Sequence, residues 1–266
     1  MEPSYEPEKR SPEPAYIRPP GLEFGRGLAI FSLVFLVFFG AQIVLFIERV
    51  IHLTPELRQQ GFSFSLLDSA HFQERYLELS SNGDVLALVS LFSGLIGLAL
   101  LFATVASWKK GRTVQFLAMR LPDWKAALAW TGLFLVVFVV LEVVAYFLPE
   151  MDSDFMKKVL ATVTNYPLLV LGVCVLPALF EEFLLRGLLY GSLRHLLDKH
   201  TSIAIVAGLF ALVHQQYEWY IQLLYVLPLG VFLGYARANT GSIWTGIFLH
   251  MLNNCLSIVL PQIFQP

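Results

Sequence analysis

Apolar runs of about 20 residues constrain this chain more than any other feature of its sequence. An α-helix needs about 20 apolar residues to cross the hydrocarbon core of a bilayer. The run 27–47 has that length. Comparable runs follow at 84–107, 125–148, 167–193, 201–217, 219–236 and 242–260. Because only helices and closed barrels satisfy their backbone hydrogen bonds in lipid, the pattern predicts an all-α polytopic membrane helix bundle with about seven transmembrane helices.

The composition agrees with this prediction. The chain is 56% hydrophobic and 14% charged, with a mean hydropathy of +0.65, which separates it from ordinary soluble domains. Its net charge is −2, and its basic residues lie in loops, so no nucleic-acid partner is expected. Cys174 and Cys255 lie in apolar runs without a metal-binding spacing, which favours packing roles. The expected partner is the lipid bilayer, and the expected location is the cell (plasma) membrane, crossed several times.

Three regions follow one another along the chain. Residues 1–26 are rich in proline and charge, which predicts a disordered cytosolic tail. Residues 27–165 are expected to form an N-terminal transmembrane region with an extramembrane linker, in which 64–79 could be an amphipathic surface helix or an ordinary loop helix. Residues 166–260 form the third region, which contains most of the polar residues considered below.

The distribution of Lys and Arg predicts the orientation of the chain. Of the 18 basic residues, Arg186 lies within a span. Twelve of the others fall in segments on the same side of the membrane as the N-terminus, and five fall on the opposite side. Because cytoplasmic loops carry the excess of Lys and Arg, we expect the N-terminus inside and the C-terminus outside.

Polar residues inside the apolar runs mark the candidate site. A charged side chain in the hydrocarbon region costs about 2.5 to 3.5 kcal/mol on insertion scales, so it usually faces a cavity or a partner. The residues concerned are Glu181, Glu182, Arg186, His214, His250, Asn253, Asn254 and Glu142. Glu142 lies near a helix end without an obvious partner, and we expect it to have a structural or interfacial role.

Helical geometry separates the two adjacent glutamates. Glu182 and Arg186 are four residues apart, share a face and can form an ion pair. Glu181 points about 100° away from Glu182 and remains available as a general base or acid. We expect Glu181 to face both His214 and His250, which belong to two other spans.

The depths of these residues agree. On the last span, His250 and Asn254 share a face, and both can donate hydrogen bonds to one point. Counting from the cytosolic ends of alternating spans places Glu181, His214, His250 and Asn254 in one layer, roughly 12 to 20 Å deep. Pro177 and Pro228 each free the carbonyl four residues before them and bend the helix beside this layer.

This set of residues suits acyl hydrolysis, and the hydrolysis of a peptide bond above all. A carboxylate and a neutral histidine can deprotonate one water, while a second histidine and an amide hold the resulting oxyanion. No His-Glu-x-x-His zinc motif and no Gly-x-Ser-x-Gly serine motif is present. Two alternatives stay open: zinc bound by Glu181, His214 and His250, and a non-catalytic peptide-binding immunity or regulatory protein. A transporter is less well supported, because no inverted pair of interrupted segments occurs.

Three motifs carry a resemblance to a known family. "EEFLLR" at 181–186 resembles Glu-Glu-x-x-x-Arg, "FALVH" at 210–214 resembles Phe-x-x-x-His, and "HMLNN" at 250–254 resembles His-x-x-x-Asn. In this order, on separate apolar runs, they are similar to the CAAX prenyl protease and bacteriocin-processing (CPBP, Abi) family of intramembrane glutamic endopeptidases. The resemblance covers about residues 167–260, and nothing in the first 165 residues adds to it.

The resemblance implies that residues 166–260 are the catalytic domain of an intramembrane protease, a membrane hydrolase that uses neither a metal nor another cofactor. Glu181 and His214 would activate the water, and His250 and Asn254 would stabilise the oxyanion. It leaves Glu182, Arg186 and Phe210 in supporting roles. The implied substrate is a peptide or a membrane protein.

Overall fold

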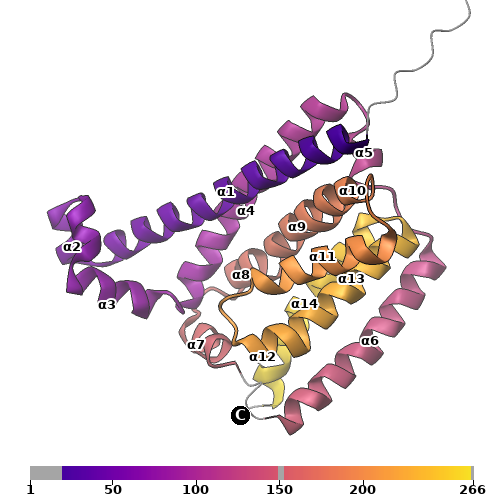
Figure 1. The fold of residues 1–266 in the computed structure, drawn as a ribbon. Coiled ribbons are helices and arrows are strands. Elements are labelled where there is room, and N and C mark those ends of the chain that lie inside the picture. The colour runs from indigo at the N-terminus through magenta and orange to yellow at the C-terminus, as the bar shows by residue number, and fades with distance from the viewer. Residues whose placement is uncertain (1–19, 149–152, 265–266) are drawn as a thin grey trace, which may run out of the picture.

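The computed structural model describes residues 20–148 and 153–264. These residues form helices and contain no strand (Figure 1). The helices are α1 (Pro20–Leu53), α2 (Pro55–Gln60), η1 (Phe64–Asp68), α3 (Ala70–Leu79), α4 (Gly83–Lys109), α5 (Thr113–Phe116), α6 (Trp124–Phe147), α7 (Asp154–Thr162), α8 (Tyr166–Leu169), η3 (Val170–Val175), α9 (Leu176–Glu181), η4 (Glu182–Leu189), α10 (Tyr190–Leu193), α11 (Lys199–Leu212), α12 (Trp219–Ile221), η5 (Gln222–Val226), α13 (Leu227–Thr240) and α14 (Ile243–Phe264). Residues 1–19 of the predicted tail lie outside the described residues, and residues 20–26 of that tail already belong to α1.

Six segments of the described chain are long and apolar enough to cross a membrane. They are Gly21–Leu53, Gly83–Lys109, Trp124–Phe147, Tyr166–Leu193, Trp219–Thr240 and Ile243–Leu260. The apolar helix α11 is shorter, and counting it brings the total to the predicted value of about seven. The prediction of an all-α, multi-pass membrane bundle is therefore confirmed.

The fifth predicted span, 201–217, is wrong in extent, because α11 ends at Leu212. Beyond that point the backbone N–H of His214 donates to Ala211 and leaves the carbonyl of Phe210 to another donor. The Nδ1 of His214 donates to that carbonyl at 2.6 Å. His214 thus lies in the turn after α11, and its ring completes the hydrogen bonding of the last helical turn.

Capping side chains define where several helices begin. The side-chain oxygen Oδ1 of Asn82 accepts from the N–H of Val85 at the start of α4. Asp123 caps α6, and Asp198 caps α11. Hydrogen bonds from the side chain and backbone of Thr201 hold the pKa of Asp198 at about 2. These are the residue types that helix N-caps prefer.

The long segment 166–193 is not a uniform α-helix. It contains two π-helical stretches, η3 before Pro177 and η4 from Glu182 onward. A third stretch, η5, precedes Pro228 in the next long segment. The predicted distortion at the two prolines therefore takes the form of π-helical turns, which are common at functional sites.

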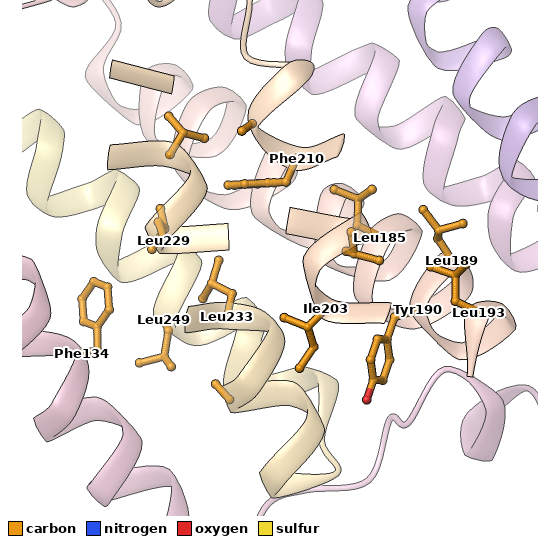
Figure 2. Packing of buried hydrophobic residues seen from close by; sticks show 14 of the residues in the cluster. Phe134, Leu185, Leu189, Tyr190, Leu193, Ile203, Phe210, Leu229, Leu233 and Leu249 are labelled. Atoms are coloured by element: carbon orange, nitrogen blue, oxygen red, sulfur yellow. The ribbon is translucent and has the colours of Figure 1, made fainter. Parts of the chain in front are cut away.

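Packing brings the motif-bearing segments together. Helix α1 lies beside α4, α4 packs along η3 and α9, and α13 lies against α11 and α14 (Figure 1). Figure 2 shows the apolar cluster that joins α6, η4, α10, α11, α13 and α14, in which Phe134, Leu185, Ile203, Phe210, Leu233 and Leu249 are labelled. The division of the chain at 165/166 stays a prediction, although α8 begins at Tyr166.

Candidate active site

A cavity of about 1430 Å³ lies among these helices. Its lining includes Glu181, His214, His250 and Asn254, the four residues for which the sequence predicted one layer. They reach it from α9, the turn after α11, and α14. Aromatic side chains of α1 line the same cavity, so the N-terminal region contributes to its walls.

The predicted ion pair between Glu182 and Arg186 forms and is fully buried. An Arg186 guanidinium nitrogen donates to Glu182 Oε1 at 2.9 Å, and another donates to the carbonyl of Gly230 at 3.1 Å. The guanidinium also lies 4.4 Å from the centre of the Phe210 ring, a favourable cation–π geometry. Phe210 therefore packs against the charged pair.

His250 contacts Glu182, whereas the sequence predicted that it would face Glu181. Its Nδ1 donates to Glu182 Oε1 at 3.1 Å, so this oxygen accepts from both His250 and Arg186. The expectation assumed 3.6 residues per turn. A π-helical stretch begins at Glu182 and has more residues per turn, which changes the direction in which each side chain points.

Glu181 faces His214, as predicted. Glu181 Oε2 lies 4.0 Å from His214 Nε2, and the two side chains are 21% and 15% exposed. The carbonyl that His214 Nδ1 contacts can only accept, so Nδ1 carries a hydrogen, and in the neutral imidazole Nε2 presents a lone pair. Glu181 Oε2 has no hydrogen-bond partner among the described residues. The separation is too long for a direct hydrogen bond, but one water can donate to both acceptors.

Asn254 contacts the carbonyl that Pro177 frees. Its Nδ2 donates to the carbonyl oxygen of Val173 at 3.3 Å, four residues before that proline. The distortion of one span is thus compensated by a polar side chain from another, as membrane helices require.

Two tyrosines that line the cavity, Tyr217 and Tyr225, received no role from the sequence. The Tyr217 ring lies parallel to that of His214, with centroids 6.3 Å apart and an interplanar angle of 9°. The Tyr225 hydroxyl lies 3.4 Å from Glu142 Oε1 and 3.1 Å from Asn253 Oδ1. Glu142 therefore has the partner that the sequence did not reveal. A tyrosine in an apolar run gives a weak signal, because tyrosines are common at membrane interfaces.

Glu181, His214 and His250 do not come together as a complete set of zinc ligands. His250 bonds to Glu182 while His214 faces Glu181. Residues 20–148 and 153–264 contain no group of three or more His, Cys, Asp or Glu side chains that could hold a metal ion.

Comparison with known families agrees with the motifs. Residues 163–256 match a family model described as type II CAAX prenyl endopeptidase Rce1-like. Searches of curated proteins and of solved structures found no match. The matched segment contains all three motifs and every residue of the predicted site. The chain is therefore a multi-pass membrane protein whose residues 163–256 are similar to the type II CAAX prenyl endopeptidases.

Proposed function

We propose that this protein hydrolyses a peptide bond by a glutamic mechanism in which Glu181 and His214 activate a water. One observation carries the proposal: Glu181 Oε2 and His214 Nε2 lie 4.0 Å apart, and both residues line the same cavity. The mechanism uses an ionised Glu181 and a neutral His214, in which both atoms are acceptors. A water that donates to both becomes more nucleophilic, and either group can take its proton. Glu182 is unsuited to this task, because it is fully buried and bonded to Arg186 and His250.

The reaction uses the remaining polar residues to stabilise charge. The water oxygen attacks the carbonyl carbon of the peptide, and its proton passes to the Glu181 and His214 pair. The carbon–nitrogen bond then breaks, and this proton goes to the leaving amine. Asn254 Nδ2 has a second hydrogen with which to hold the oxyanion.

His250 can join Asn254 only in its doubly protonated form. Its Nδ1 hydrogen is used by Glu182, so donation from Nε2 requires the imidazolium. The Glu182 carboxylate beside it stabilises that charge. In this arrangement Glu182 and Arg186 are positioning residues, and they need no contact with the substrate.

The proposed substrate is a peptide or membrane protein whose cleavable bond reaches this buried layer. The aromatic side chains of α1 in the cavity wall favour apolar residues or groups next to that bond. The bilayer itself would deliver such a substrate from the side of the bundle.

The test is cleavage of a peptide library by the purified full-length protein in lipid nanodiscs. Glu181→Gln keeps the shape of the side chain but removes the base, and we expect kcat to fall by about 100-fold or more. Glu218→Gln is the matched control, because it makes the same change at an exposed carboxylate and should leave kcat unchanged. Equal activity of wild type and Glu181→Gln would refute the proposal.

The same assay distinguishes the glutamic mechanism from a zinc-dependent mechanism and from a non-catalytic peptide-binding function. Activity that a chelator abolishes and zinc restores would favour the metal mechanism over the glutamic one. Binding of library peptides without any cleavage product would favour the non-catalytic reading.

A further inference from the structure

A chain of polar contacts leads from the proposed oxyanion site to helix α6. It runs from Val173 to Asn254, Asn253, Tyr225 and Glu142. The successive separations are 3.3, 3.4, 3.1 and 3.4 Å. All four side chains line the catalytic cavity. Glu142 lies outside the segment that matches the family model, residues 163–256.

The Val173 carbonyl sets the direction of every hydrogen bond in this chain. A backbone carbonyl can only accept, so the Asn254 amide must turn its nitrogen toward Val173. Its oxygen then faces Asn253 and accepts from that residue's nitrogen. The Asn253 oxygen in turn needs a donor, which is the hydroxyl of Tyr225. Reversing either amide would bring two oxygens together.

Tyr225 has no hydrogen left for its contact with Glu142, so this contact needs a hydrogen from the glutamate. A phenolic hydroxyl has one hydrogen, and two acceptors lie within its reach, Asn253 Oδ1 at 3.1 Å and Glu142 Oε1 at 3.4 Å. The order of the two amides assigns this hydrogen to Asn253, which is also the nearer acceptor. Ser257 also hydrogen-bonds to this hydroxyl, but it brings its own hydrogen and can donate to Tyr225. The hydrogen between Tyr225 and Glu142 Oε1 must therefore belong to the glutamate, because an ionised carboxylate would face the phenol oxygen without a hydrogen between them.

We propose that Glu142 is a protonated carboxylic acid and a positioning residue for the active site. As the terminal donor of the chain, it completes the hydrogen bonds that begin at the Val173 carbonyl and holds the amides of Asn253 and Asn254 in the orientation that this carbonyl sets, with the Asn254 nitrogen available to the oxyanion. The positioning role of Glu142 rests on the proposed function, in which Asn254 stabilises the oxyanion. The surroundings agree with a neutral acid, since no ion pair joins Glu142 to a basic side chain in the described part of the chain.

Infrared spectroscopy tests the protonation state independently of activity. The purified full-length protein is compared with Glu142→Gln at neutral pH, in H₂O and in D₂O. We expect wild type to contain a carbonyl band of a protonated carboxylic acid that shifts in D₂O and is lost in Glu142→Gln. The same band should persist in Glu218→Gln, which removes an exposed carboxylate. Identical carboxylic acid bands in wild type and Glu142→Gln would overturn the proposal.

Kinetics tests the positioning role. A glutamine nitrogen can still donate to Tyr225, so Glu142→Gln should retain kcat, whereas Glu142→Leu should lose between about 10-fold and 100-fold in kcat at nearly constant KM. Tyr225→Phe interrupts the same chain and should match the leucine variant. An equal loss in the glutamine and leucine variants would mean that the negative charge is needed and would contradict the proposal. If wild type cleaves nothing, the proposed function fails, and the infrared result still decides the state of Glu142.

Discussion

At the scale of single residues, two neighbouring glutamates differ through their surroundings. Glu182 has no exposed surface and accepts hydrogen bonds from Arg186 and His250. Glu181 lines the cavity, and its Oε2 has no hydrogen-bond partner among the described residues. Identical functional groups therefore have different tasks: the first holds charged groups in place, and the second is free to accept a proton from a water.

This difference predicts that truncating Glu182 destabilises the protein more than truncating Glu181. Glu182→Ala leaves a buried guanidinium without its counter-ion, so we expect a loss of about 3 to 5 kcal/mol in the free energy of unfolding. Glu181→Ala removes a partly exposed side chain and should cost about 1 kcal/mol or less. Thermal unfolding in detergent measures both. A larger loss of stability in Glu181→Ala than in Glu182→Ala would contradict the assigned roles.

At the scale of elements, the close approach of α4 to η3 positions the segment that leads to the two glutamates. A Cβ at Gly172 would collide with the backbone carbonyl of Ala87 on α4. A backbone atom cannot rotate away as a side chain can. The π-helical stretch η3 can therefore lie this close to α4 only with glycine at that position.

The contact predicts that Gly172→Ala forces the two elements apart. We expect a loss of about 1 to 3 kcal/mol in the free energy of unfolding, the usual cost of overpacking. Gly132 is the matched control: it lies within α6, and a Cβ there would meet no atom within 4 Å. Gly132→Ala should be neutral or slightly stabilising, because alanine is the better helix former. Equal thermal stability of Gly172→Ala and wild type would show that the contact is not restrictive.

At the scale of the whole molecule, the start of α1 and the end of α14 lie at opposite ends of the bundle (Figure 1). An odd number of crossings gives this result, and counting the shorter α11 with the six longer spans gives seven. Because α11 is short, its C-terminal turn carries His214 to the level of Glu181. A full-length membrane helix in its place would carry this turn beyond that level.

Reporter fusions test this topology. A reporter after Pro266 should lie on the opposite side of the membrane from one fused before Met1. A reporter inserted at Gly111, in the loop that follows α4, should lie on the same side as the N-terminus. If both terminal reporters are found in the cytosol, α11 is not a crossing, and the predicted orientation is wrong.

The sequence alone determined the membrane class, the main spans, the family motifs and the Glu182 and Arg186 pair. All of these depend on local spacing: run length gives a span, and two residues four apart share a helix face. The tertiary structure decided that His250 contacts Glu182, that Asn254 contacts the carbonyl freed by Pro177, and that Tyr225 links Glu142 to the site. Periodicity specifies depth and approximate face, whereas these contacts depend on the rotation of each helix about its axis. Interhelical packing and π-helical turns set that rotation.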